Sequence, residues 1–216
     1  RSGGILHERY ENGQSPAAQH LMFSVTKSFT GTLLLMLMEQ GRIDASKAVV
    51  EYLPELRDTA FADATVQQVL NMTNSIAYDD PESDIGKFIA AMYLGGEGLY
   101  SHLQSLERKA PDLEHGEAFH YATPDSEVLG WIIRRATGMT LADVLYEMIW
   151  SKLGTEFEAH YWIDPMGIEM AGGGLSMALR DAARFGQMIL DDGKANGERV
   201  VSAGIAERIR TQANQE

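Results

Sequence analysis

The sequence has no cysteine among its 216 residues. This absence excludes disulfide bonds, thiolate metal ligands and a cysteine nucleophile. It does not fix the compartment, because many periplasmic proteins also lack cysteine. No signal peptide stands at the start, which favours the cytoplasm. However, the chain begins abruptly at Arg1 inside a predicted strand, so we expect a fragment that a signal sequence can precede.

Basic residues are also scarce. The chain has 18 Lys and Arg against 31 Asp and Glu, which gives a net charge of −13. Such a balance is unfavourable for binding nucleic acid or an anionic membrane surface. The most apolar run, Leu33–Met38, is far shorter than the roughly 20 residues that a membrane-spanning helix needs. We therefore expect a small-molecule partner, with no nucleic acid and no membrane.

Metal and phosphate motifs are absent as well. The histidines show none of the close spacings, such as His-x₃-His, that metal sites use. They stand at positions 7, 20, 102, 115, 120 and 160. Gly172–Gly174 lacks the spacing of a phosphate-binding loop. We expect no metal and no organic cofactor, and we interpret His120 as a solvated loop residue.

One stretch stands out from this background. Phe23–Thr32, followed by Leu33–Met38, predicts a short approach segment and then a buried helix that ends at Gly41. Ser24 would lie in its first turn, with Lys27 three residues later on the same face. A serine hydroxyl becomes a nucleophile when a neighbouring base takes its proton. A lysine serves as that base when neutral, and both burial and the positive helix end disfavour its charge.

The Ser-x-x-Lys pattern alone is weak. With 13 serines and 6 lysines in the chain, about 0.4 such pairs are expected by chance. The alternative is that Ser24 caps a core helix and Lys27 is a solvated lysine of its first turn. The surrounding sequence has to decide between these interpretations.

The rest of the chain predicts many helices and few strands. Residues 4–10 and 161–163 are predicted strands, by partial alternation and by β-branched and aromatic residues. Thr65 and Thr140 are predicted helix caps. The predicted helices cover residues 48–53, 65–72, 85–94, 99–109, 126–137, 141–153 and 178–190, and the last part of 200–210.

Several stretches together resemble the serine hydrolases of the class C β-lactamase and DD-peptidase superfamily. They are residues 23–29, 39–44 with 52–56, 121–131, and 171–176 with 180–186. Ser75–Pro81 and Tyr161–Asp164 resemble the 6-aminohexanoate-dimer hydrolase branch most. The resemblance implies an α+β fold of the β-lactamase/transpeptidase type, in which a helical domain packs on an antiparallel sheet.

The resemblance also implies roles for particular residues. Tyr121 takes the place of the family's tyrosine motif, which faces the serine and moves protons together with Lys27. Thr123 stands where the motif has asparagine, which weakens the case for β-lactam recognition, because it lacks the amide's donor and acceptor pair. Tyr78, Thr123 and Asp125 are expected to bind substrate, and Gly173 and Gly174 to form the cleft wall.

The family's Lys-Thr-Gly or His-x-Gly strand, which closes the site, has no counterpart before Glu216. We therefore expect residues 1–216 to form one domain, as a fragment that lacks strands at both ends and has an incomplete sheet. The Ser24 N–H would then supply one half of an oxyanion hole.

These observations predict a serine hydrolase that cleaves small amides or esters through an acyl-enzyme. The alternative is a non-catalytic binding or structural protein that keeps the fold. Linear amides, esters, β-lactams and peptides remain open as substrates. A charged linear amide would need a carboxylate for its amine, and the candidates are Asp79, Asp80 and Asp125.

Overall fold

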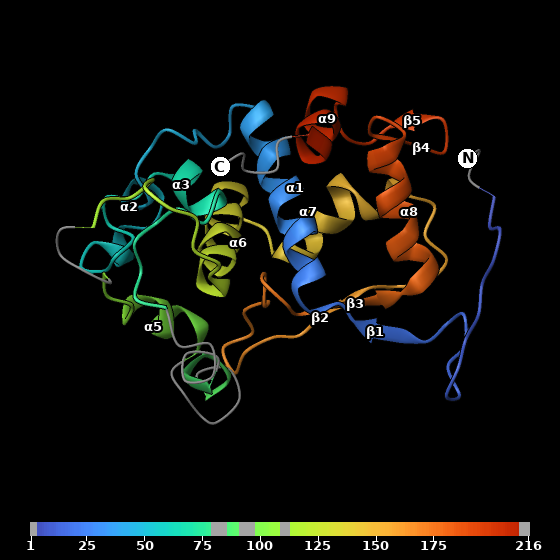
Figure 1. The fold of residues 1–216 in the computed structure, drawn as a ribbon, viewed down its shortest axis with the longest axis horizontal. Coiled ribbons are helices and arrows are strands. Elements are labelled where there is room, and N and C mark those ends of the chain that lie inside the picture. The colour runs from blue at the N-terminus through green and yellow to red at the C-terminus, as the bar shows by residue number, and fades with distance from the viewer. Residues whose placement is uncertain (1–3, 79–85, 91–97, 109–112, 212–216) are drawn as a thin grey trace.

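The long helix α1, Thr26–Glu39, runs through the centre of the molecule (Figure 1). The structure is a computed structural model that describes residues 4–78, 86–90, 98–108 and 113–211. Apolar residues occur on nearly every side of α1, so most of this helix is buried. Phe29, Leu33, Leu34 and Leu37 have no exposed surface. The predicted buried helix is therefore confirmed, and it starts two residues after Ser24.

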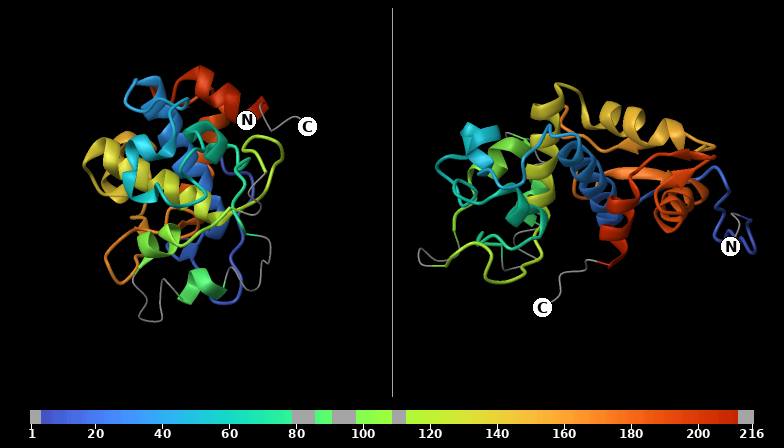
Figure 2. Two further views of the ribbon diagram at one scale, coloured as in Figure 1. Left: turned by 90° about the vertical axis from the view of Figure 1, so that its left-hand side faces the viewer. Right: turned by 90° about the horizontal axis from the view of Figure 1, so that it is seen from above.

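Helices surround α1 on both sides (Figure 2). It packs against α6 (Thr123–Thr137), α7 (Leu141–Met148) and α9 (Ala203–Thr211). The α6 side also carries α2 (Val49–Tyr52), α3 (Val66–Leu70) and α5 (Leu99–Gln104), and residues 86–90 are helical. The opposite side carries α8 (Leu179–Leu190) and the sheet (Figure 1). The stacked rings of Phe29 and Phe185, 3.9 Å between centroids, join α1 to α8.

The predicted caps are present. The Thr65 hydroxyl accepts a hydrogen bond from Gln68 N at 3.1 Å, and Thr140 accepts from Asp143 N at 3.1 Å. Each satisfies an N–H that has no partner within its own helix. Gly138 ends α6 with φ 72°, a left-handed conformation that suits glycine.

The larger sheet is antiparallel and has the order β1-β3-β2. Its strands are β1 (Gln19–Leu21), β2 (His160–Tyr161) and β3 (Leu175–Ala178). Leu21 lies opposite Ser176, and Tyr161 lies opposite Leu175. Neither β1 nor β3 was among the strands predicted from the sequence, which were residues 4–10 and 161–163. The chain also forms a small hairpin of β4 (Lys194–Ala195) and β5 (Glu198–Arg199), which turns at Asn196 and Gly197, both with positive φ.

The predicted strand at residues 4–10 is wrong, because this segment is extended without strand pairing. The ion pair of Glu8 with Arg180 holds it against α8 in place of a backbone ladder. Arg180 donates to both carboxylate oxygens of Glu8, at 2.7 and 2.6 Å. These bonds, together with that of Tyr10, lower the pKa of Glu8 to about 2. A partly alternating pattern alone does not make a strand where no neighbouring strand pairs with it.

Helices packed on an antiparallel sheet confirm the predicted α+β class. Among the described residues, none of the helices has both the length and the apolar character needed to cross a bilayer.

Close packing at Gly130 gives the first prediction. A Cβ atom on Gly130 of α6 would lie 2.4 Å from Ala171 Cβ, whereas one on exposed Gly186 of α8 would meet nothing within 4 Å. Gly130→Ala should therefore destabilise the protein by about 1–3 kcal/mol through overpacking. Gly186→Ala, the matched control, should stabilise it by about 0.5–1 kcal/mol through helix propensity. Urea denaturation measures both, and equal effects of one sign would contradict the packing described.

Candidate active site

Ser24 lies in a tight turn between β1 and α1. The turn is a 3₁₀ helix, η1, that covers Phe23–Val25. Phe23 has φ 45°, a left-handed conformation that is strained for a bulky residue. Met22 N donates to Leu175 O at 2.8 Å, which ties the start of the turn to β3. The strained turn leaves the Ser24 side chain exposed at the N-terminal end of the central helix.

Lys27 Nζ is surrounded by three oxygen atoms. It lies 3.1 Å from Ser24 Oγ, 3.4 Å from Thr123 Oγ1 and 2.6 Å from Gly172 O. An ammonium group has three donors and no acceptor, and a backbone carbonyl only accepts. An ammonium Lys27 can donate to all three oxygens, whereas a neutral amine can donate to two of them and accept from the Ser24 hydroxyl, so the neutral lysine stays a prediction. The three contacts also join α1, α6 and the glycine-rich segment at one atom.

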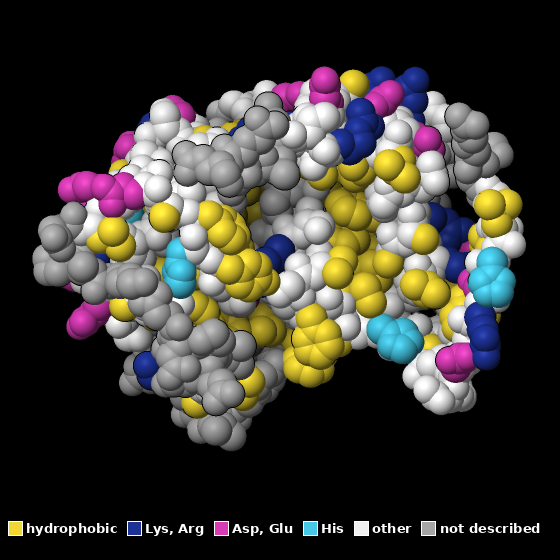
Figure 3. Space-filling view, viewed as in Figure 1, with side chains coloured by type: hydrophobic (Ala, Val, Ile, Leu, Met, Phe, Trp, Pro, Cys, Tyr) yellow, Lys and Arg dark blue, Asp and Glu magenta, His cyan; other side chains and the backbone are white. Residues whose placement is uncertain are grey.

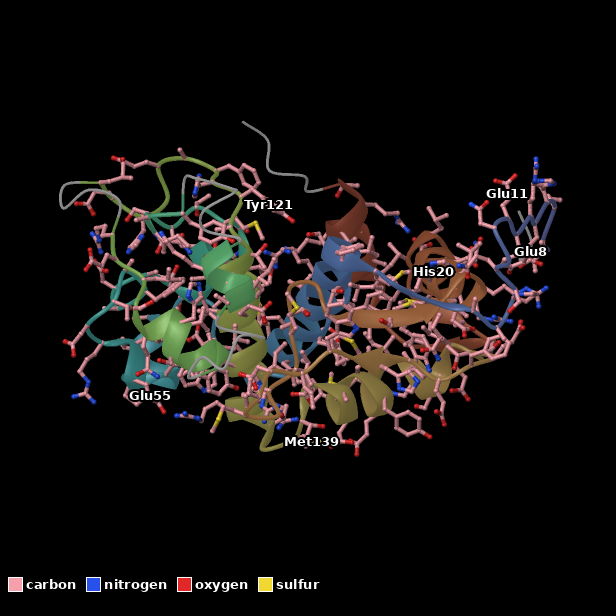
Figure 4. The ribbon with its side chains drawn as sticks, turned by 90° about the horizontal axis from the view of Figure 1, so that it is seen from below. Glu8, Glu11, His20, Glu55, Tyr121 and Met139 are labelled. Carbon is pink, nitrogen blue, oxygen red and sulfur yellow. The ribbon has the colours of Figure 1, made fainter. Side chains whose placement is uncertain are left out.

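Tyr121 completes this group. Its hydroxyl oxygen is 2.7 Å from Ser24 Oγ, and Lys27 Nζ is 5.3 Å from its ring centroid. The Tyr121 side chain is 50% exposed. Figure 4 places it on the α3–α6 side of the molecule and His20 on the sheet side, whereas Glu55 and Met139 lie toward the far edge. The predicted trio of Ser24, Lys27 and Tyr121 is thus brought together from residues 97 positions apart.

The segment that carries Tyr121 is fixed by hydrogen bonds to residues 72–78. Gly116 N donates to Thr73 O at 2.6 Å, and His120 N donates to Met72 O at 2.7 Å. The His120 ring Nε2 lies 2.6 Å from Tyr78 O and donates to that carbonyl. His120 is therefore a partly buried anchor of the loop, and its interpretation as a solvated histidine is wrong.

The glycine-rich segment forms the opposite wall. Its backbone is held by α1, because Thr30 Oγ1 donates to Ala171 O at 2.7 Å and Leu175 N donates to Thr26 Oγ1 at 3.2 Å. A Cβ atom on Gly173 would lie 3.9 Å from the Phe23 carbonyl carbon, which places Gly173 beside the Ser24 turn. Gly174 packs on Met170, where a Cβ atom would lie 2.6 Å from that side chain.

Two of the predicted substrate contacts lie elsewhere. Asp125 has no exposed surface, and its Oδ1 accepts from Asn74 Nδ2 at 2.6 Å. Burial raises the pKa of Asp125 well above its usual range, against the lowering effects of Asn74 and Lys27. In this geometry Asp125 is a core residue behind the site, which removes it from the groups that touch a substrate. Tyr78 is 8% exposed and packs in the core.

Asp79 and Asp80 lie outside the described residues. Thr123 does face the site through its contact with Lys27. In the space-filling view the surface is hollowed between the α6 side and the α1 side, with hydrophobic side chains along both walls (Figure 3). Within the described part of the chain, His, Asp and Glu form no group of three that would hold a metal ion.

Two further residues near the site, Glu127 and Asn74, were not predicted from the sequence. Glu127 is 1% exposed, and its two carboxylate oxygens accept from Ala171 N at 2.7 Å and Gly172 N at 2.8 Å. Burial raises its pKa to about 7, against the lowering effect of these two N–H groups. Its position directly before the apolar run Val128–Ile133 of α6 was the one available signal. Asn74 gave none.

The comparisons with known proteins agree with this geometry. The model of the Beta-lactamase family matches residues 2–216, and the chain belongs to that family. The 6-aminohexanoate-dimer hydrolase of Paenarthrobacter ureafaciens is 36% identical over 226 aligned positions, covering 100% of this chain and 57% of that protein. The chain thus spans less than two thirds of this relative.

Solved structures show the same fold. The "Putative 6-aminohexanoate-dimer hydrolase from Bacillus anthracis" superposes with a TM-score of 0.85 at 37% identity, over 95% of this chain and 56% of that one. EstCE1, a hydrolase with promiscuous acyltransferase activity, superposes with a TM-score of 0.72 at 16% identity, over 91% of this chain and 64% of that one. The predicted resemblance and fold type are confirmed.

Burial of Asp125 gives a prediction on stability against pH. Its pKa is higher in the folded protein than in the unfolded chain, so wild-type stability is lost as pH rises above the unfolded value of 3.8. Asp125→Asn lacks this loss, so the stability of the variant relative to wild type should increase from pH 4 to pH 8. Urea denaturation at both pH values measures the difference.

Asp44 provides a control. Hydrogen bonds from Ser46 lower the pKa of Asp44, so the stability that its charge contributes is lost only as pH falls below the unfolded value of 3.8. The stability of Asp44→Asn relative to wild type should therefore change little between pH 4 and pH 8. A difference between Asp125→Asn and wild type that does not change with pH would contradict the buried, protonated Asp125.

Proposed function

We propose that this protein is a serine hydrolase that cleaves small amides or esters through an acyl-enzyme on Ser24. The observation that carries the proposal is the placement of Ser24 Oγ 2.7 Å from the Tyr121 hydroxyl oxygen and 3.1 Å from Lys27 Nζ. Both distances are within reach for proton transfer in the absence of substrate. Membership of the Beta-lactamase family supports this reaction class.

Acylation requires a base for the Ser24 proton. We propose that Lys27 is an ammonium and that Tyr121 therefore accepts this proton as a phenolate, a form that the neighbouring positive charge stabilises. Ser24 Oγ then bonds to the substrate carbonyl carbon. The Ser24 N–H, at the N-terminal end of α1, stabilises the developing oxyanion.

Collapse of the tetrahedral intermediate breaks the bond to the alcohol or amine. Tyr121 returns the proton to this leaving group. Water then attacks the acyl-enzyme with Tyr121 again as base, and hydrolysis releases the acid and restores Ser24. Lys27 keeps its contacts to Gly172 and Thr123 throughout, so it orients the pair and supplies charge.

The acylation chemistry can be tested directly. A fluorophosphonate probe should label wild-type protein on Ser24, as located by peptide mass spectrometry, and Ser24→Ala should show no label. Lys27→Ala and Tyr121→Phe should each lower turnover of a p-nitrophenyl ester by about 10²- to 10⁴-fold. Ser28→Ala, on the exposed side of α1 one turn later, is the matched control and should retain activity. Absence of labelling in the complete wild-type protein would favour the non-catalytic alternative.

Substrate preference is a second test. Burial removes Asp125 from the carboxylates available for the amine of a charged linear amide, and Thr123 lacks the amide group that suits a β-lactam. An ester also needs less leaving-group protonation than an amide. We expect kcat/KM for a p-nitrophenyl ester to exceed that for the 6-aminohexanoate dimer and for a chromogenic cephalosporin. A higher value for either amide would show that other residues supply the missing contacts.

A further inference from the structure

Glu127 is a fully buried carboxylate directly behind the proposed site. It stands in the first half of α6, four residues after Thr123, and it is 1% exposed. Its two oxygens take one backbone N–H each, from Ala171 at 2.7 Å and from Gly172 at 2.8 Å. A carboxylate that accepts two short N–H bonds fixes both the position and the tilt of the peptide between them.

That peptide region carries the shortest contact of Lys27. Gly172 donates its N–H to Glu127 and offers its carbonyl oxygen to Lys27 Nζ at 2.6 Å. Lys27 Nζ in turn lies 3.1 Å from Ser24 Oγ. A continuous chain of hydrogen bonds therefore runs from Glu127 through the backbone of Gly172 to Lys27 and Ser24.

The packing leaves this segment little freedom. On the α1 side, Thr30 Oγ1 donates to Ala171 O at 2.7 Å. On the α6 side, a Cβ atom on Gly172 would lie 2.8 Å from Glu127 Oε1 and 2.9 Å from Thr123 Cγ2. Glycine at 172 is thus what allows the carboxylate to approach the backbone so closely. The segment depends on Glu127 for its fit against α6.

Charged and titratable groups surround Glu127 on several elements. Lys27 of α1 favours its ionised form, whereas Asp164 disfavours it, and Tyr161 of β2 lies within electrostatic range. Asp125, on the same helix, also interacts with Lys27. Because burial raises the pKa of Glu127 to about 7, its charge changes in the neutral pH range.

We propose that Glu127 is a positioning residue of the hydrolase reaction: its ionised carboxylate fixes the backbone at Ala171 and Gly172, so that the Gly172 carbonyl holds Lys27 beside Ser24. When Glu127 is protonated, one of its oxygens carries a hydrogen atom, and this O–H and the backbone N–H that faces it are both donors. The hold on Gly172 is then weaker, and Lys27 is less well oriented. The inference rests on the proposed function, because it concerns the same Ser24 reaction.

The test compares Glu127→Gln and Glu127→Asp with wild type in the complete protein. In Glu127→Gln, the amide NH₂ faces one of the two backbone N–H groups, so the backbone shifts. We expect kcat for a p-nitrophenyl ester to fall about 10- to 100-fold through misorientation, with KM nearly unchanged. In wild type, kcat should rise through neutral pH as Glu127 ionises. This rise should disappear in Glu127→Gln. Glu127→Asp, which keeps the charge, should restore part of kcat and the pH dependence.

Asp181 offers a matched control. It is also fully buried, and its carboxylate also accepts two backbone N–H groups, from Glu156 at 2.9 Å and Phe157 at 3.1 Å. It belongs to α8, and its hydrogen-bond partners among the described residues are Glu156, Phe157 and Arg184 rather than Lys27, Gly172 or Ser24. Asp181→Asn should therefore lower stability but leave the pH profile of kcat as in wild type.

Two outcomes would overturn the inference. One is a pH profile of Glu127→Gln that superimposes on that of wild type while fluorophosphonate still labels Ser24. If Glu127→Gln does not fold, carboxyl ¹³C NMR of wild type replaces it. The pH at which Glu127 titrates should then equal the midpoint of the wild-type kcat profile. A clear difference between these two pH values is the second outcome that would overturn the inference. Failure of Ser24 labelling in wild type would instead reject the proposed function.

Discussion

The site depends on one atom, Lys27 Nζ, and on the three oxygens that surround it. These oxygens come from the Ser24 turn, from the start of α6 and from the glycine-rich segment before β3. An ammonium in the partly buried interior is stable when hydrogen bonds replace the water it loses. The hydrogen bonds that stabilise the charge of Lys27 therefore also hold three distant parts of the chain together. A change that removes the charge should also loosen the site.

Two carboxyl groups lie near Lys27, but neither forms an ion pair with it. Glu127 and Asp125 are both buried near Lys27, and burial raises the pKa of each. Neither contacts Nζ directly, so the positive charge is not neutralised by a salt bridge and remains available to Tyr121. Perturbed carboxyl groups of this kind are typical of functional sites. Here they lie behind the reacting groups. Glu127 acts through its hydrogen bonds to the backbone, and both carboxyl groups interact electrostatically with Lys27.

Much of this was predictable from the sequence, for identifiable reasons. The buried helix and the Ser24–Lys27 pair depend on local spacing, and the place of Tyr121 followed from a resemblance over the whole chain. The burial of Asp125 could not be predicted, because helical spacing does not say whether a carboxyl faces a cleft or the core. Glu127 was missed, because its partners are backbone N–H groups 44 and 45 residues away. Backbone partners leave no side-chain pattern in a sequence.

The most direct test of this account is the charge of Lys27 in the free protein. Labelling the lysines with ¹³C at Cε, and assigning Lys27 by the signal lost in Lys27→Ala, allows NMR to distinguish ammonium from amine. The account predicts that Lys27 is an ammonium at pH 7, because its three oxygen neighbours match three donors. A neutral amine at pH 7 would contradict it, and would make Lys27 itself the base that removes the Ser24 proton.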